Sequence, residues 1–532
     1  MSQGEVSQLE LDILTALAAT RELKNSSIRI NRIPSDILSL IPTHLDSQGD
    51  VLRASFVCRH WRRVFLQHGA LWSKLFIQRR EDYVTTLLER AKGSALHIAL
   101  DDQVPPHIIA LLCPHAQKIR HLEFVFNCWT DISRFSQVNS GQLPLLRTLE
   151  IWAVEDEIDV DDQSDTFTTP PLPLFSGCVN LEEFNLHLEA EHVRTLDHFV
   201  FPNLTMFSLT VELSHPYDAL ELLDFLKASP TLRTVNVKIY GRLTPEDVPQ
   251  HMSVILPNVE TFSLYAMDDE WHVFESAMHI SCPRAKHTSL THAVYNEQMT
   301  NGLNIFPDSA SWKTIVRQYS TSPVEGVTLE INGGQQETTN KCSLTFRSFD
   351  ATVIKLGFKV SETLPDGIGL SREEVNLRIL TQACRVIRSH PLLSSLRRLH
   401  IKDYKRTLGT DHRLSIAYVI GGLFESLGPL DELIIHGCDV QIFLLPFINP
   451  GVFQSFGRIL PRLDFPRVKE LTISEALMVD EKECVDGIVN LAKLQHELQR
   501  PFEHVTIWAR EIPTMMAERL GQWVGAVDCH EP

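Results

Sequence analysis

The residue types that could hold a metal ion gather between residues 279 and 292. His279, Cys282, His287 and His292 offer imidazole and thiol groups, which are donors that Zn²⁺ prefers. Their spacing fits none of the usual zinc pairs, and no two cysteines of the chain form a CxxC motif. The sequence therefore predicts surface histidines and a core cysteine here, and it predicts neither a bound metal nor any other cofactor.

Patterns typical of catalytic sites are also missing from the sequence. His496-Glu497 lacks the second histidine of an HExxH helix, and Gly333-Gly334 is not followed by the lysine of a phosphate-binding loop. The chain has no G-x-S-x-G elbow and no dinucleotide fingerprint. Cys58 has Val57 and Trp61 as helical neighbours, which is typical of a packed apolar thiol. We therefore expect no catalytic residues and no enzyme.

Charge and hydropathy narrow the classes of partner and location. The 532 residues include 67 acidic and 49 basic residues, which gives a net charge of −18. Nucleic acid and anionic membrane surfaces both favour basic proteins, so we expect neither as the general partner. No apolar run reaches the length of a membrane span, and the N-terminus lacks the pattern of a secretory leader. The 10 scattered cysteines fit reduced thiols, and hence a cytoplasmic or nuclear location.

A short helical unit at residues 30–76 carries more apolar surface than it can bury by itself. Pro34 suits the start of a helix because its missing N–H would be unsatisfied there anyway, and Ile37 and Leu38 follow at helical spacing. Such a small unit needs the following domain, a partner or both to cover this surface. The remaining apolar positions of the unit are Ile41, Leu45, Val51, Leu52, Phe56, Val57, Cys58, Trp61, Phe65, Leu71, Trp72, Leu75 and Phe76.

This unit resembles an F-box. The residues that carry the resemblance are Ile33-Pro34, Asp36-Ile37-Leu38, Leu45, Leu52, the run Val57-Cys58-Arg59-x-Trp61-Arg62, and Leu71-Trp72. Isoleucine replaces the usual leucine before the proline, and residues 47–49 make a looser joint between the first two helices. The resemblance implies docking onto the Skp-type adaptor of a cullin–RING ubiquitin ligase. The residues that would make this contact are Ile33, Pro34, Ile37, Leu38, Leu52, Val57, Cys58 and Trp61. A structural three-helix unit that never meets an adaptor is the alternative.

Residues 1–29 are expected to form an N-terminal helix and a linker. Val6, Leu9, Ile13, Leu14 and Leu17 recur at three- and four-residue steps in this stretch. A helix directly ahead of the F-box is similar to the arrangement in large fungal families of F-box-like proteins. The pattern is too short for a persuasive coiled coil. We expect the helix to pack on the neighbouring domain rather than to pair with another chain.

An apolar triplet recurs through residues 77–532. It consists of an apolar residue, two variable residues, a second apolar residue, one variable residue and a third apolar residue. The pattern resembles a degenerate leucine-rich repeat, in which each copy supplies one short strand. Residues 81–92, 217–228 and 371–389 read as helices, whereas the acidic stretch 155–173 and the polar stretch 332–340 read as loops. The copies begin at Ile119, Leu146, Leu181, Leu204, Leu232, Val259, Ala285, Val324, Val353, Leu396, Leu430, Val468 and Phe502, with a fainter one at Gly93.

The fold class that follows is α/β. An N-terminal helical F-box precedes a curved, leucine-rich-repeat-like solenoid of short parallel strands and helices. Side chains alternate along a strand, so the two residues that flank the middle apolar residue, and the one after the last apolar residue, point away from the core and line the concave face of the array. Most of these positions are acidic or hydroxylic, but two successive copies present basic residues. Lys355, Lys359, Arg398, His400 and Lys402 are therefore predicted to form a patch for an acidic or phosphorylated segment of a target protein.

The sequence thus predicts a substrate-recognition subunit of an SCF-type (cullin–RING) ubiquitin ligase. The F-box would bind the Skp-type adaptor, and the repeat array would bind the target protein for ubiquitination. Ubiquitin transfer would depend on proximity, with no side chain of this chain performing the chemistry. The alternative is a leucine-rich-repeat scaffold for protein–protein interaction that acts outside any ubiquitin ligase.

Overall fold

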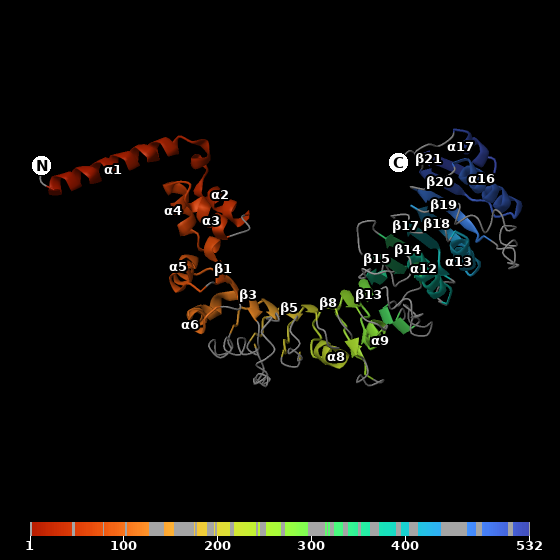
Figure 1. Ribbon diagram of the computed structural model, residues 1–532, viewed down its shortest axis with the longest axis horizontal. Helices are drawn as coiled ribbons and strands as arrows, with labels where there is room; N and C mark the ends of the chain where they lie inside the picture. Colours follow the sequence, from red (N-terminus) through yellow and green to blue (C-terminus); the bar gives the residue numbers. More distant parts are fainter. Residues whose placement is uncertain are drawn as a thin grey trace. The chain divides into compact units, whose positions relative to one another are not determined.

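The computed structural model divides the chain into two compact units, residues 1–204 and 205–532. Figure 1 shows the chain coloured from its N-terminus to its C-terminus. The residues that the structure describes are 3–44, 48–77, 79–101, 104–126, 143–153, 175, 178–188, 196, 199–212, 217–240, 243–244, 252–267, 272–295, 314–315, 318–319, 324–333, 339–348, 353–361, 372–389, 395–403, 413–437, 465–474, 481–508 and 514–530. The predicted acidic loop 155–173 and Leu45 lie outside these residues.

The chain begins with a long helix whose apolar side chains stay exposed. Helix α1 spans Gln3–Ser26. Leu14 is 62% exposed and Leu23 is 74% exposed, and only Ala18 and Asn25 among its described side chains are partly covered. The expectation that this helix packs its apolar stripe on the neighbouring domain is therefore wrong for the described residues. The periodic pattern predicted the helix correctly, but periodicity alone does not say whether a face is covered.

The F-box-like stretch folds as short helices around an aromatic core. The elements are η1 (Arg29–Arg32), α2 (Ser35–Leu40), η2 (Ile41–His44), α3 (Gln48–Ser55), α4 (Arg59–Gln67) and η3 (Gly69–Trp72). Leu38, Phe65 and Trp72 are fully buried in this unit. The indole Nε1–H of Trp72 donates to the carbonyl oxygen of Phe65 at 2.8 Å, so the polar atom of this buried ring is satisfied. The core thus ties the exit segment back onto α4.

A parallel sheet follows the helices in the first unit. Strands β1 (Lys74–Ile77), β2 (Leu96–Leu100), β3 (Ile119–Phe126), β4 (Thr148–Ala153) and β5 (Glu183–Leu188) pair in chain order. Helix α5 (Glu81–Ala91), α6 (Pro106–Ala110) and the turn η4 (Cys113–Lys118) connect the first three strands. Alternate residues of β2, β4 and β5 are buried, which leaves one polar face on each strand.

The second unit starts with a similar set of parallel strands. The strands are β6 (Met206–Val211), β8 (Thr234–Ile239), β11 (Thr261–Met267) and β13 (His287–Tyr295), paired in that order. Helices α8 (Ala219–Lys227) and α9 (His272–Met278) lie on one side of them in Figure 1. Two short pairs, β7 (Tyr217–Asp218) with β9 (Leu243–Thr244) and β10 (Val254–Ile255) with β12 (Ile280–Ser281), also run parallel.

An antiparallel meander then interrupts the parallel order. Strands β14 (Val324–Gly333), β15 (Thr339–Ser348) and β16 (Val353–Ser361) pair side by side in opposite directions. The last of them, β16, pairs with β13, and the first, β14, pairs with the next strand along the chain. The spatial order is therefore β13, β16, β15, β14. Within the polar stretch predicted as a loop at 332–340, residues 332–333 end β14 and residues 339–340 begin β15, and residues 334–338 lie outside the described part of the chain.

The chain then returns to parallel strands that alternate with helices. The strands are β17 (Arg398–Asp403), β18 (Leu430–His436), β19 (Val468–Ser474), β20 (His504–Trp508) and β21 (Ala526–His530). Helices α12 (Arg372–Ser389), α13 (Arg413–Glu425), α16 (Glu481–Glu497) and α17 (Thr514–Leu520) lie along one side of this strand set (Figure 1). None of the described helices combines the length and the apolarity that a membrane span requires.

The predicted triplets mark the buried side of most of the long parallel strands. Phe184, Phe207 and Phe262 stand at the middle position of their triplets and are almost completely buried. Burying one such side chain stabilises a fold by about 1.5–3 kcal/mol relative to exposure. The triplet at Ala285 looked weak in the sequence, but it too forms a strand, with Leu290 buried. The apolar triplets therefore locate the strands, although they do not give the strand order.

Candidate functional site

The helices of the F-box-like unit divide the predicted adaptor-binding residues into buried and exposed sets. Leu38 is fully buried, and Trp61 is only 7% exposed. Both therefore belong to the packing of the unit itself. Ile37 and Val57 are at least half exposed, and Pro34 is also exposed. Ile33, Leu52 and Cys58 are partly covered.

Two further apolar side chains extend the exposed set. Leu40, on α2, is 54% exposed, and Phe56, between α3 and α4, is 65% exposed. Ile37 and Leu40 are three residues apart and share the outer face of helix α2, whereas Leu38 is on its inner face. Together with Ile37 and Val57 these residues are the exposed apolar side chains of a unit whose core is already closed, and they are called its exposed apolar surface. Such a surface is typical of a docking site.

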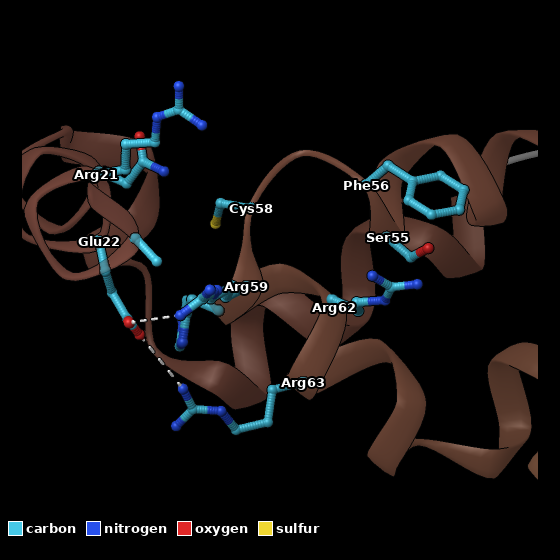
Figure 2. Close-up of a pocket in the computed structure, with 11 residues that line it drawn as sticks. Arg21, Glu22, Ser55, Phe56, Cys58, Arg59, Arg62 and Arg63 are labelled. Atoms are coloured by element: carbon cyan, nitrogen blue, oxygen red, sulfur yellow. Dashed lines mark hydrogen bonds and ion pairs between the residues drawn. The ribbon is translucent and has the colours of Figure 1, made fainter. Parts of the chain in front are cut away.

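A cleft opens beside this surface, between the C-terminal part of α1 and the start of α4. Its volume is about 500 Å³, and Figure 2 shows the side chains around it. Four guanidinium groups and one carboxylate dominate its polar lining, and the thiol of Cys58 lies between the two helices. The residues around the cleft are Ala18, Arg21, Glu22, Asn25, Ser55, Phe56, Cys58, Arg59, His60, Arg62 and Arg63.

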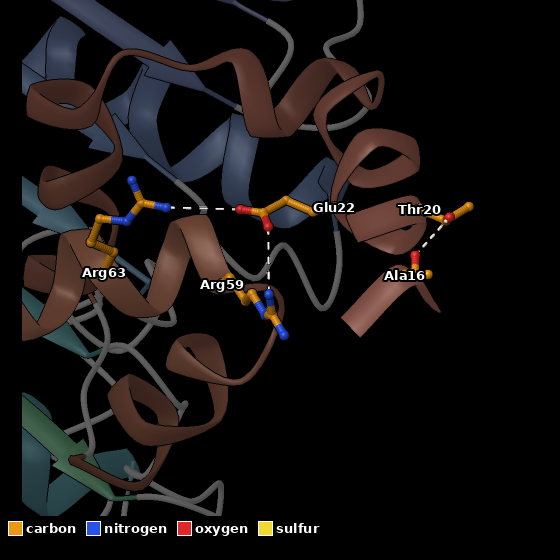
Figure 3. Close-up of polar contacts among 5 residues, drawn as sticks. All are labelled: Ala16, Thr20, Glu22, Arg59 and Arg63. Atoms are coloured by element: carbon orange, nitrogen blue, oxygen red, sulfur yellow. Dashed lines mark hydrogen bonds and ion pairs between the residues drawn. The ribbon is translucent and has the colours of Figure 1, made fainter. Parts of the chain in front are cut away.

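Glu22 connects the two walls of this cleft. Its carboxylate lies 3.5 Å from Arg59 and 3.9 Å from Arg63 (Figure 3). All three side chains are at least half exposed, so each ion pair is worth at most about 1 kcal/mol. Arg62 is placed differently, with its guanidinium 5.1 Å from the centre of the Phe56 ring.

The start of α4 concentrates positive charge. Cys58 is its N-cap and makes no capping hydrogen bond through its side chain, and the first turn has no acidic residue. The positive end of the helix dipole also lies there, so Arg59, Arg62 and Arg63 are placed where cations are least favourable. Glu22 offsets part of this charge from α1. Three arginines within the five residues 59–63 are the signal in the sequence that predicts this basic surface, besides the family resemblance of the same run.

The predicted basic patch is divided by the meander. Lys355 lies on β16 and the set of Arg398, His400 and Lys402 lies on β17, but β15 and β14 stand between these strands. These residues come from successive triplets of the sequence, but the strands of the two triplets are not neighbours in the sheet. Sequence order suggested neighbours, whereas the hairpin of β14 and β15 separates them in space. The backbone of Lys359 lies on β16, and its side chain is outside the described part of the structure.

Acidic side chains surround the β17 part of the patch. Arg398 lies 3.8 Å from both Glu325 and Glu432, and His400 lies 3.5 Å from Glu432. Burial lowers the pKa of His400 below its usual value, while Glu432 opposes this shift. At neutral pH the positive charge of this part of the patch therefore comes from Arg398 and Lys402, and not from His400.

An arginine that sequence analysis missed completes this region. Arg347 on β15 is directly across from Gly326 on β14, and Gly326 is in turn across from Arg398. The missing side chain of Gly326 leaves a hollow of about 60 Å³, lined by both arginines, His400 and Thr328. The TNKCSLTFRS strand that carries Arg347 has the alternation of a strand but lacks the apolar triplet. Alternation would have been the signal to use.

The histidines and cysteine weighed first in the sequence do not converge. Nδ1 of His279 is hydrogen-bonded to the carbonyl oxygen of Met252, at 2.9 Å. Cys282 is buried, and burial raises the pKa of its thiol to about 12. Within the described residues, ligand-type side chains converge in one place only, where His97, His121 and Glu123 meet on β2 and β3.

Comparison with known families matches one segment of the chain. Residues 30–78 match the F-box-like family. No match is found among curated proteins. The match covers the helical unit described above and ends within a residue of the end of β1. An F-box-like domain is therefore present at residues 30–78, and it carries the exposed apolar surface and one wall of the arginine-rich cleft.

Proposed function

We propose that this protein is the substrate-recognition subunit of an SCF-type (cullin–RING) ubiquitin ligase. The observation that carries the proposal is the F-box-like domain at residues 30–78, whose core is closed while its apolar surface stays open. F-box domains generally bind Skp-type adaptors, so the natural occupant of this surface is the adaptor. Through the adaptor the chain would join a cullin–RING ligase.

The adaptor contact is assigned to the exposed residues rather than to all the predicted ones. A partner can cover the exposed apolar side chains without disturbing the core. These side chains are Ile37, Leu40, Phe56 and Val57. Pro34 is exposed beside them. Trp61 and Leu38 act by holding the helices in place. The arginines of the α1–α4 cleft would favour an acidic rim on the adaptor.

The target contact is assigned to the polar face of the strands after the F-box-like domain. These strands are the copies of a degenerate leucine-rich repeat in this proposal, and arrays of that kind bind partners on the strand face. The hollow between Arg347 and Arg398 would accept a carboxylate or phosphate group of the target, because a guanidinium matches both groups. Glu325 and His400 also line the hollow, and Lys402 follows His400 on β17. Lys355 is on β16, the strand next to the one that carries Arg347.

Catalysis in this proposal is proximity. A folded array holds lysines of the target near a ubiquitin-charged enzyme, and the gain comes from the raised effective concentration. No residue of this chain performs the ubiquitin transfer, and the protein is not itself an enzyme. A cytoplasmic or nuclear location follows, because the proposed partners work there.

An interaction scaffold outside any ligase is the second candidate. It is favoured by the size of the second unit, which spans residues 205–532 and has an apolar core of its own. Such a unit could bind a partner without any contribution from the F-box-like domain. The two candidates differ in one measurable property, which is binding to the adaptor.

Co-purification with a Skp-type adaptor tests the proposal. The full chain and the adaptor are expressed together, and the retained adaptor is quantified. Ile37→Asp/Val57→Asp should lower adaptor affinity by about 30-fold or more, because a charge at the centre of an apolar interface costs at least about 2 kcal/mol.

Ile255→Asp is the matched control for that experiment. Ile255 is 64% exposed and lies in the second unit, so its change introduces one of the same aspartates on a comparably open apolar site. It should leave adaptor binding unchanged. If the wild-type chain retains no adaptor, the ligase proposal fails and the scaffold proposal stands.

A further inference from the structure

Two histidines and a glutamate meet on the polar face of the first sheet. His97 on β2 and His121 on β3 are across from each other in register. Their ring centres are 3.6 Å apart with an angle of 35° between the ring planes. Glu123 follows two residues after His121, so it is on the same face of β3. One possible ligand atom from each of the three side chains lies within 4.8 Å of the others.

The cluster has both a cation and a carboxylate on the neighbouring strands. Lys74 on β1 is across from His97 in register, and Glu150 on β4 is across from Glu123. All three side chains of the cluster are half-buried. Neutral imidazole is the form that binds a metal ion.

We propose that His97, His121 and Glu123 bind a divalent transition-metal ion, with Zn²⁺ as the best match. Two imidazole nitrogens and one carboxylate oxygen are a donor set that Zn²⁺ accepts. A tetrahedral Zn²⁺ with bonds of about 2.1 Å holds its ligand atoms about 3.4 Å apart. The ligand atoms now lie within 4.8 Å of one another, so the side chains, including the two imidazole rings, would rotate to direct their lone pairs at one ion. The three side chains are half-buried, so solvent ions can reach them.

Three protein ligands leave a coordination position free. Water, or a donor from a bound protein segment, would complete the set. Glu150 on β4 is across from Glu123 in register and is the nearest candidate for supporting the ligands. This site lies in the first unit and does not depend on the proposed ligase function.

Metal titration of the full chain tests the inference. Zn²⁺ is measured by calorimetry after removal of metal with a chelator, and Co²⁺ is used as a spectroscopic probe of coordination. The wild-type chain should bind one equivalent of Zn²⁺ more tightly than any weak sites on its other histidines. Co²⁺ should give the visible absorption of a four- or five-coordinate site.

Variants of the three ligands give the decisive comparison. His97→Asn/His121→Asn should lose the tight equivalent and the Co²⁺ absorption. Glu123→Gln, which keeps the shape of the side chain, should weaken Zn²⁺ binding at least about tenfold. Zn²⁺ should raise the Tm of the wild-type chain but not that of the double variant.

His187→Asn is the matched control for a change of histidine on the same sheet. His187 stacks on Trp152 and is outside the cluster. It should keep the tight equivalent. If the double variant or Glu123→Gln binds Zn²⁺ with the wild-type stoichiometry and affinity, the inference is overturned. Absence of a tight equivalent in the wild-type chain also overturns it.

Discussion

Single residues decide how the F-box-like unit separates its core from its surface. Trp72 is fully buried, donates to Phe65 and lies under the guanidinium of Arg90, which is 4.7 Å from the ring centre. The sequence predicted Trp72 as part of the unit because it follows the helical pattern closely. It could not predict which of Ile37 and Leu38 faces inward, because both fit a helical stripe. The packing of α2 against α4 makes that choice.

Trp72→Phe should destabilise the first unit. The phenyl ring cannot donate to the Phe65 carbonyl and leaves a cavity, so the expected loss is about 2–4 kcal/mol in the free energy of unfolding. Urea unfolding followed by circular dichroism measures the shift of the first transition. Trp508→Phe is the control, because Trp508 is 37% exposed on β20 and its change should move the curve little. Equal shifts for the two variants would contradict the role of Trp72.

Acid should destabilise the first unit through His97. Its folded pKa of about 4 is below the usual value of 6.5, so between these values the unfolded chain binds a proton that the folded chain does not. The contribution of His97 to the free energy of unfolding is therefore complete above pH 6.5, and it decreases as the pH falls toward 4. Unfolding in the presence of a chelator at pH 7, 6 and 5 measures this slope. His97→Asn should show a smaller slope, and an unchanged slope would assign the acid sensitivity elsewhere.

Single elements show where sequence patterns succeed and where they fail. The triplets predicted most strands because burial of every second residue is a local property. Strand β21 (AVDCH) lacks the triplet, and β1 (KLFI) was interpreted as the exit of the helical unit. The meander could not be predicted from triplets, because strand direction depends on long-range pairing rather than on local burial. The apolar stripe of α1 likewise predicted a helix but not its exposure.

Gly357 is required where the meander joins the parallel strands. A Cβ at this position of β16 would lie 2.5 Å from Oγ1 of Thr291 on β13. Gly357→Ala should therefore force the strands apart and cost about 1–3 kcal/mol in the free energy of unfolding of the second unit. Adding Thr291→Ala should restore part of this loss, because it removes the atoms in the way.

Gly428→Ala is the control for that comparison. A Cβ at Gly428 meets nothing within 4 Å. This substitution should be neutral or slightly stabilising, since it reduces the freedom of the unfolded chain. Urea unfolding of all four chains measures the differences. If Gly357→Ala is as harmless as Gly428→Ala, the close approach of β16 and β13 is not a constraint.

At the scale of the whole molecule, the proposed contacts lie in different units. The exposed apolar surface is within residues 30–78, and the arginine hollow is within residues 205–532. Sequence order was enough to separate these two regions, because the F-box resemblance and the repeat pattern occupy different stretches. It was not enough to define the basic surface, since Arg347 enters it only through the pairing of β15 with β14.

Adaptor binding and target binding should therefore be separable by substitution. Arg347→Glu/Arg398→Glu reverses both charges of the hollow, so target capture should fall by at least about tenfold while adaptor binding stays unchanged. Ile37→Asp/Val57→Asp should have the opposite effect, and the two sets combined should act additively because they share no contacts. Quantitative co-purification of adaptor and target, with ubiquitin transfer blocked, measures both losses. Lys227→Glu, at an exposed lysine on α8, controls for charge reversal alone. If the arginine variant still captures every target of the wild-type chain, the hollow is not the target site.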